Sequence, residues 1–134
     1  YAHLGAVKAN GKTIAVLGSG LKHIYPAENK ELCNEIVKKG GAIITEYEPH
    51  IKPLPMNFPS RNRIISGLSN GVLVVEAKQK SGTLITVDYA LEQGKDVFVI
   101  PGNITSTNSY GTNDLIKQGA KPVTNIQEII EEII

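Results

Sequence analysis

An α/β fold with a mostly parallel sheet is the fold class that this sequence predicts. Short aliphatic and β-branched runs alternate with segments whose apolar residues recur at helical spacing. One run, residues 71–76, is almost continuously apolar, which is typical of a parallel strand covered on both faces. Such alternation produces parallel strands joined by right-handed crossovers. We therefore expect one domain that spans residues 1–134.

The first third of the chain is expected to form two strands with a helix between them. Residues 13–17 form a strand that ends in a tight glycine turn at residues 18–20. Asn29 is the expected N-cap of the helix, and Gly40 ends it, as glycine often does at helix C-termini. Residues 42–45 are the second strand.

A long loop and a basic helix start follow. The loop, residues 46–59, contains four prolines, and loops of this length in a compact domain are more often functional than not. Ser60 is the expected cap of the next helix, which places Arg61 and Arg63 in its first turn. Cations there oppose the helix dipole. Because the free N–H groups of a helix start already bind anions, we expect a phosphate among these arginines.

The remaining residues are expected to complete the α/β alternation. Ser81 caps a helix that runs to about Gln93 and is closed by Gly94. A polar loop covers residues 104–111. The other expected elements are strands at 71–76, 96–100 and 121–123, and helices at 113–118 and from 126 to the chain end.

Several polar segments are expected to share one edge of the sheet. In a parallel α/β sheet every helix begins beside the carboxyl ends of the strands, and ligands bind along that edge. The segments are the turn Gly18-Ser19-Gly20, the start with Arg61 and Arg63, Glu76, the start Lys80-Ser81-Gly82-Thr83, and the loop after Pro101.

Each of these features also has a purely structural interpretation. The turn at residues 18–20 is either part of a phosphate site or a plain tight turn, since it lacks the third glycine of a dinucleotide motif. Ser81 either binds a phosphate or only caps its helix. Glu76 is either a catalytic carboxylate or a structural acceptor, and Phe58 either stacks on a base or lies in the core.

The charge distribution favours a local anion site. The net charge of the chain is only +1, but residues 52–80 carry +4 and residues 81–134 carry −4. A local basic stretch suits one anionic ligand better than a generally sticky surface.

Other classes of site have little support. The three histidines are scattered and Cys33 is the only cysteine, so neither a metal, a cofactor nor an internal disulfide is expected. We interpret Cys33 as a core residue on its helix. The sequence has no nucleophile elbow, no signal peptide and no apolar run of about 20 residues, so the cytoplasm is the expected compartment and no membrane contact is expected.

Ordered motifs run along the whole chain. They are Ala15–Leu21 with Ile24-Tyr25-Pro26 and Asn29, Phe58–Leu68, Val74–Ala77 with Lys80–Thr86, Val99–Gly102, Gly111–Asn113 and Leu115–Ala120. Together they resemble the DNA-processing protein A family (DprA, also called Smf). The resemblance implies a Rossmann-like three-layer domain that binds single-stranded DNA, forms a homodimer and helps to load the RecA recombinase during natural transformation. It implies no catalytic activity.

The resemblance also implies which residues meet DNA. Arg61, Asn62 and Arg63 would line the binding pocket with Phe58 close by. Lys80, Ser81, Gly82 and Thr83 would offer a helix start to a phosphate, and Gly18, Ser19 and Gly20 would complete the rim. The family pattern begins with an earlier strand and a Gly-Ser-Arg turn that this sequence does not contain, so the N-terminal part of the domain is expected to be missing.

Two other functions also agree with parts of the sequence. A nucleotide phosphoribohydrolase of the lysine-decarboxylase-like (LOG) group has a Pro-Gly-Gly-x-Gly-Thr-x-x-Glu motif at the helix start that residues 80–86 occupy here, but the catalytic glutamate is absent. A protein-binding module would use the sheet edge or the acidic C-terminal helix. Its isoleucines, Ile129, Ile130, Ile133 and Ile134, form either a contact face or, as we prefer, part of the core.

Overall fold

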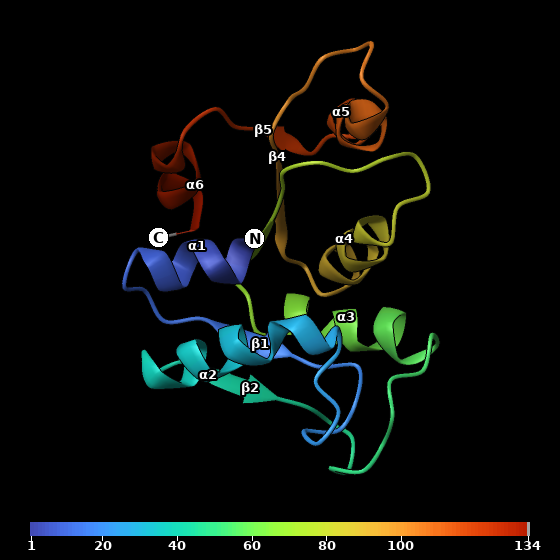
Figure 1. The fold of residues 1–134 in the computed structure, drawn as a ribbon. Coiled ribbons are helices and arrows are strands. Elements are labelled where there is room, and N and C mark those ends of the chain that lie inside the picture. Colours follow the sequence, from blue (N-terminus) through green and yellow to red (C-terminus); the bar gives the residue numbers. More distant parts are fainter. Residues whose placement is uncertain (134) are drawn as a thin grey trace. The chain divides into compact units, whose positions relative to one another are not determined.

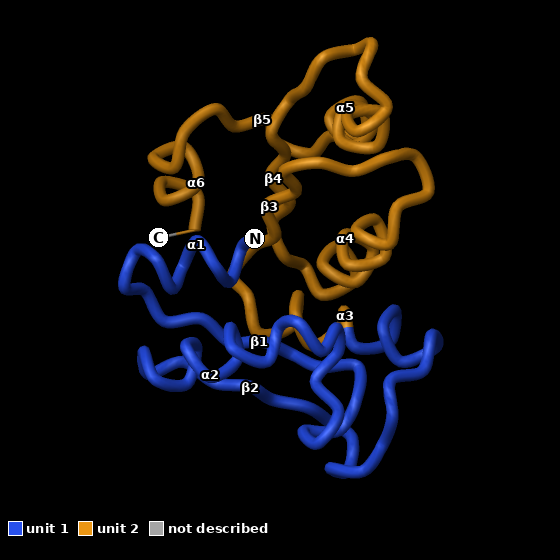
Figure 2. Tube along the Cα trace, in the orientation of Figure 1, with its two compact units in different colours: residues 1–61 blue, residues 62–134 orange. Residues whose placement is uncertain are grey.

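The chain folds into two compact α/β units. A computed structural model describes residues 1–133. Unit 1 comprises residues 1–61 and unit 2 comprises residues 62–134 (Figure 2), and the division falls within helix α3. Each unit has its own parallel sheet and its own apolar core.

Unit 1 is built on a two-stranded parallel sheet. Strands β1 and β2 pair in parallel with Ile14 opposite Ala42. Helices α1 and α2 contact each other (Figure 1), and the core consists of Val7, Ala15 and Ile36. Helix α1 was not anticipated from the sequence. The elements are α1 (Ala2–Lys8), β1 (Ile14–Val16), a 3₁₀ turn η1 (Ala27–Asn29), α2 (Lys30–Lys38) and β2 (Ala42–Ile44).

The two ends of α2 differ in how well the sequence predicted them. Gly40 follows the helix with φ of +84°, a left-handed conformation that favours glycine. Asn29 occupies the N-cap position of the helix, as predicted, but its side chain makes no capping hydrogen bond. Because η1 runs directly into α2, the backbone of Asn29 (φ −87°, ψ 5°) lacks the extended conformation of an N-cap.

Helix α3 (Asn57–Gly67) begins earlier than Ser60, the cap that the sequence suggested. Pro59 is its third residue, and a proline fits the first turn of a helix because its missing N–H would have no partner there. Arg61 and Arg63 are consequently the fifth and seventh residues of α3. The prediction that they occupy the first turn is therefore wrong, and the dipole argument no longer applies to them.

Unit 2 is built on a three-stranded parallel sheet with the order β3-β4-β5. Helix α4 contacts β3 and β4, and α5 contacts β4. The buried core contains Val74, Val87, Val99 and Leu115. The elements are β3 (Gly71–Val74), α4 (Thr83–Glu92), β4 (Asp96–Val99), a 3₁₀ turn η2 (Thr107–Ser109), α5 (Tyr110–Lys117), β5 (Lys121–Pro122) and α6 (Ile126–Ile133).

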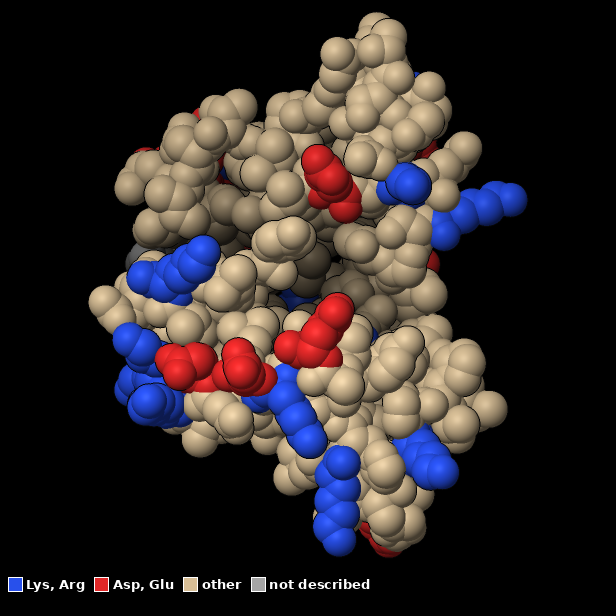
Figure 3. Space-filling view, viewed as in Figure 1, with Lys and Arg blue, Asp and Glu red and all other residues tan. Residues whose placement is uncertain are grey.

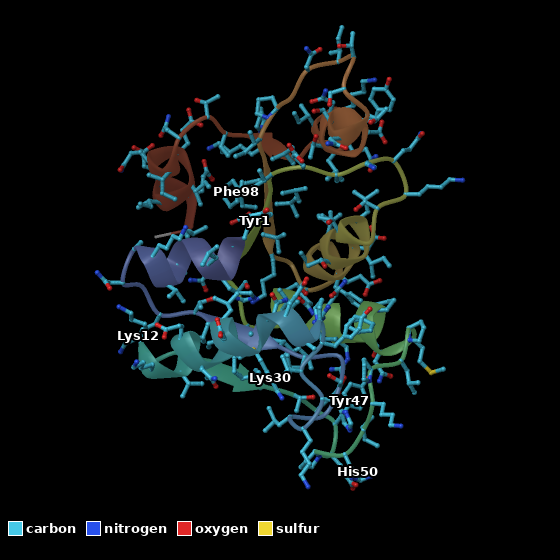
Figure 4. The ribbon with its side chains drawn as sticks, in the orientation of Figure 1. Tyr1, Lys12, Lys30, Tyr47, His50 and Phe98 are labelled. Atoms are coloured by element: carbon cyan, nitrogen blue, oxygen red, sulfur yellow. The ribbon has the colours of Figure 1, made fainter. Side chains whose placement is uncertain are left out.

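The α/β class with parallel strands is confirmed, but residues 71–76 do not form the strand covered on both faces that their apolar run predicted. Strand β3 ends at Val74, and Leu73 is 42% exposed. The fully apolar pattern fits β4 instead, where Val97, Phe98 and Val99 are all buried (Phe98 in Figure 4). The reason is that β4 is the central strand of its sheet, whereas β3 is an edge strand.

The C-terminal helix is amphipathic rather than a core element. Ile129, Ile130 and Ile133 are half-buried, and no described residue of α6 is buried. The core interpretation of these three residues is therefore wrong, and Ile134 lies outside the described residues. None of the helices in residues 1–133 has the length and hydrophobicity of a bilayer-spanning segment.

Candidate functional site

An aromatic and cationic cluster lies at the end of β1 in unit 1. We call Gly18, Tyr25, Phe58 and Arg61 the Phe58 cluster. The guanidinium carbon of Arg61 lies 5.5 Å from the centroid of the Phe58 ring, within the range of a cation–π interaction. The rings of Tyr25 and Phe58 are 5.9 Å apart at an angle of 52°, a tilted aromatic pair.

Arg61 is fixed by the end of the first strand. Its Nη1 donates a hydrogen bond to the carbonyl oxygen of Val16 at 2.6 Å. Burial lowers the pKa of the guanidinium, but an arginine in a protein keeps its proton. The result is a half-buried cation whose position is set by a backbone carbonyl and an aromatic ring.

The glycine turn after β1, residues 18–20, packs closely against other residues of unit 1. A Cβ atom on Gly18 would lie 2.9 Å from Cδ1 of Phe58, so this ring rests directly against the glycine. The hydroxyl of Ser19, a residue only 1% exposed, donates to the carbonyl oxygen of His23 at 2.7 Å. A Cβ atom on Gly20 would lie 2.1 Å from the carbonyl oxygen of Glu48. The structure thus brings Gly18 to Phe58 but directs the Ser19 hydroxyl inward.

The remaining residues of the arginine motif lie in unit 2. Arg63 is exposed and Asn62 is half-buried, and the carbonyl oxygen of Arg63 accepts a hydrogen bond from Nε2 of Gln93 at 3.0 Å. Side chains two positions apart on a helix are rotated by about 200° about the helix axis, so they point to nearly opposite sides. Arg61 and Arg63 therefore project from different sides of α3, a separation that the linear motif does not reveal.

The second predicted helix start lies one residue later than expected. Helix α4 starts at Thr83 with Gly82 at the N-cap position. The hydroxyl of Ser81 accepts a hydrogen bond from the Thr83 N–H at 3.2 Å, a local capping contact. Lys80 is exposed and has a left-handed backbone (φ +60°). An added Cβ on Gly82 would meet nothing within 4 Å, so the outer side of this start is open.

A shallow cavity lies beside this helix start. It measures about 250 Å³ and is lined by Glu76, Ala77, Lys78, Ser81 and Asn108. Glu76 follows β3, is exposed, and makes no hydrogen bond or ion pair with any described residue. The structure therefore does not support the interpretation of Glu76 as a structural acceptor.

Backbone contacts explain one glycine of the motif Gly111-Thr112-Asn113. The Gly111 N–H donates to the carbonyl oxygen of Ala77 at 2.8 Å. A Cβ atom on Gly111 would lie 2.6 Å from the carbonyl oxygen of Lys78. The side chain of Asn113 exchanges two hydrogen bonds with the backbone of Gly102. This motif thus joins the segment after β3 to the loop after β4 and stabilises the cavity wall.

Metal chemistry and thiol chemistry find no support among residues 1–133. No group of three or more metal-ligating side chains occurs within this range. His3 is hydrogen-bonded to Thr13 at 2.9 Å, and burial, with smaller contributions from the terminal amino group and Arg61, lowers its pKa. Cys33 is half-buried, and burial raises the pKa of its thiol. Cys33 is therefore a poorer nucleophile than an exposed thiol.

Tyr25 belongs to the motif Ile24-Tyr25-Pro26, but the sequence analysis assigned it no role in the site. A tyrosine before a proline in a polar loop belongs to no helical or strand pattern, so its position alone does not indicate what it contacts. Only the contact with Phe58, 33 residues away, places Tyr25 in the Phe58 cluster.

Curated relatives of known name are closely similar in sequence. The chain is 51% identical to Protein Smf of Escherichia coli over 98% of the chain and 35% of that protein. It is 47% identical to DNA processing protein DprA of Bacillus subtilis over 98% of the chain and 44% of that protein. The chain thus spans less than half the length of these relatives.

Solved structures agree with the sequence relationship. The X-ray structure of DprA from Streptococcus pneumoniae matches with a TM-score of 0.90 at 47% identity, covering 99% of this chain and 47% of that one. DprA from Helicobacter pylori, whose structure is described as giving its single-stranded DNA binding mode, matches with a TM-score of 0.79 at 34% identity, covering 90% of this chain and 55% of that one. The expected Rossmann-like α/β class is confirmed by these matches.

A family assignment follows from both kinds of comparison. The family described as DNA recombination-mediator protein A matches residues 1–134. This assignment favours the DNA-processing protein A family, which the motifs resemble, over the phosphoribohydrolases. The chain belongs to the DNA recombination-mediator protein A family.

Proposed function

We propose that this chain binds single-stranded DNA, without catalysing a reaction on it, as part of a recombination mediator. The observation that carries the proposal is the Arg61 guanidinium held against the Phe58 ring. Proteins that bind single strands combine cations for the phosphates with aromatic rings for the bases. The single-stranded DNA binding described for the H. pylori relative supports the same ligand.

The charge of unit 1 supports an anionic ligand. Residues 1–61 contain eight Lys and Arg residues against five Asp and Glu residues, a net charge of +3. Residues 62–134 contain six against eight, a net charge of −2. In Figure 3, which has the orientation of Figure 2, basic side chains lie at the left edge and in the lower part of unit 1, and a short row of acidic side chains lies between them. A polyanion is therefore attracted more strongly to unit 1.

Each residue of the proposed DNA site has a distinct role. Arg61 binds a phosphate from a fixed position, whereas Arg63 and Lys80 contribute charge from exposed side chains. At the start of α4 the N–H groups of Thr83, Leu84 and Ile85 are already donated to Ser81 and Gly82. The open position at Gly82 is therefore where a second phosphate approaches this helix start. The proposed set is Gly18, Ser19, Gly20, Phe58, Arg61, Asn62, Arg63, Lys80, Ser81, Gly82 and Thr83. Ser19 belongs to it only as a support of the turn, because its hydroxyl is bonded inward.

The cellular role follows from the family. We propose that the chain acts in the cytoplasm as a homodimer, and that it helps to load a RecA recombinase on single-stranded DNA taken up in natural transformation. The homodimer and the RecA interaction are proposed for the whole protein, because this chain spans less than half the length of its relatives.

Binding to a labelled oligo(dT) at two salt concentrations tests the proposal. Fluorescence anisotropy should show binding that weakens steeply with salt, because bound cations release counterions from the strand; the expected slope is about −0.7 per phosphate contacted. Duplex DNA should compete poorly. Absence of binding, or equal affinity for duplex DNA, would contradict the proposal.

Charge variants sharpen the test. The double variant Arg61→Ala with Arg63→Ala should weaken binding to all single-stranded sequences. The matched control is Lys12→Ala with Lys38→Ala, which removes two exposed cations of unit 1 outside the proposed site. Equal losses in both double variants would mean that only the overall charge matters.

A further inference from the structure

The two aromatic rings of the Phe58 cluster differ in the area that they leave open. Phe58 is half-buried, and its ring contacts Gly18, the Arg61 guanidinium and the Tyr25 ring. Tyr25 is 58% exposed. We propose that Tyr25, rather than Phe58, provides the surface on which an unpaired base stacks, and that Phe58 holds the Tyr25 ring in place. This inference rests on the proposed function.

The glycine turn fixes the backbone that leads to Tyr25. The N–H of His23 donates to the carbonyl oxygen of Gly20 at 2.9 Å, and the carbonyl oxygen of His23 accepts the Ser19 hydroxyl. The N–H of Lys22 donates to the carbonyl oxygen of Pro49 at 3.1 Å. Hydrogen bonds to the glycine turn and to Pro49 thus fix the backbone at residues 22 and 23, two residues before the tyrosine. This gives the buried Ser19 a function without a direct DNA contact.

The Tyr25 side chain is oriented by ring packing rather than by a hydrogen bond. Its hydroxyl makes no hydrogen bond with any described residue, so the tilted contact with Phe58 is what orients it. A tilted pair leaves one ring as support and the other with an open face. Every base offers a π-face to such a ring, so stacking here tolerates any sequence.

The surrounding charge indicates a nucleotide rather than an apolar peptide. The Arg61 cation lies against the same Phe58 ring that supports Tyr25, and unit 1 has a net charge of +3. A nucleotide satisfies both features at once, because its base covers an aromatic ring while its phosphate meets a cation.

Three matched variants test the stacking role with the oligo(dT) assay. Tyr25→Leu keeps apolar bulk but removes the π-face, and we expect binding about tenfold weaker with an unchanged salt slope. Tyr25→Phe should bind like the wild type. Tyr110→Leu is the control, because Tyr110 is 45% exposed in unit 2 and lies outside the Phe58 cluster. A single 2-aminopurine in the oligonucleotide should be quenched by the wild type and by Tyr25→Phe, but less by saturating Tyr25→Leu.

Several results would overturn the inference. They are wild-type affinity and quenching in Tyr25→Leu, an equal loss in Tyr25→Phe, and an equal loss in Tyr110→Leu. If Tyr25→Leu fails to fold, photocrosslinking of the wild-type chain to 5-iododeoxyuridine oligonucleotides replaces it: attachment at Tyr25 supports the inference, and attachment only elsewhere refutes it. A wild-type chain that binds normally while Tyr25→Leu is unaffected refutes the stacking role alone. A wild-type chain that does not bind refutes the proposed function as well.

Discussion

Replacing Arg61 should destabilise the fold more than replacing Arg63, although both belong to one motif. Arg61 donates a hydrogen bond to the Val16 carbonyl and packs over Phe58. A hydrogen bond from a charged group contributes about 1.5–3 kcal/mol, and a cation–π contact at a partly exposed site about 0.5–1 kcal/mol. We therefore expect Arg61→Ala to lower the free energy of unfolding by about 2–4 kcal/mol. Arg63 is exposed, so solvent screens its interactions, and its replacement should cost at most about 1 kcal/mol.

Urea and thermal denaturation followed by circular dichroism measure this difference. For a chain of this size, the loss in Arg61→Ala corresponds to a decrease in Tm of roughly 10 °C. Arg61→Lys should recover only part of it, because an ammonium lacks the planar group that stacks on Phe58. The reasoning would be refuted if Arg61→Ala unfolded at the same temperature as Arg63→Ala. DNA binding by Arg61 variants must therefore be compared well below their Tm.

Other consequences of the structure are also measurable. Gly20→Ala should destabilise by about 1–3 kcal/mol because its Cβ would lie 2.1 Å from the Glu48 carbonyl oxygen, whereas Gly82→Ala, which meets open space, should stay near wild-type stability in the same denaturation assay. His3 has a lowered pKa in the folded state, so its neutral form is favoured and stability should decrease as the pH falls below about 6.5, the ordinary histidine value; His3→Gln should flatten this part of the stability profile, and an unchanged profile would contradict it. The Cys33 thiol should react with iodoacetamide at pH 7.5 more slowly than free glutathione, because burial raises its pKa, and reaction at an equal rate would show that it is accessible and ionised.

Local signals were sufficient for most elements of this chain. The strand at 14–16 and the end of α2 at Gly40 were predicted because alternation, periodicity and a left-handed glycine act within a few residues. The start of α3 was misplaced for an equally local reason: Pro59 is compatible with a loop and with the first turn of a helix, and the sequence alone does not distinguish the two.

Burial, by contrast, was decided by tertiary structure. Residues 71–76 and 96–100 have nearly the same apolar character, yet β4 is central and β3 is an edge strand. The order of strands in a sheet depends on contacts between segments distant in the chain, and no pattern within one strand encodes it.

The candidate site shows the same division. The amino-acid sequence by itself determined the residue types of the site, namely arginines, glycines and an aromatic residue in a recognisable order. Only the tertiary structure decided which of them meet: Arg61 reaches the carbonyl of Val16, 45 residues earlier, and Phe58 packs against Gly18 and Tyr25. It also separated Arg61 from Arg63, because a helix turns neighbouring side chains in different directions. A linear motif specifies chemistry, whereas packing between distant segments determines which side of each residue remains available to a ligand.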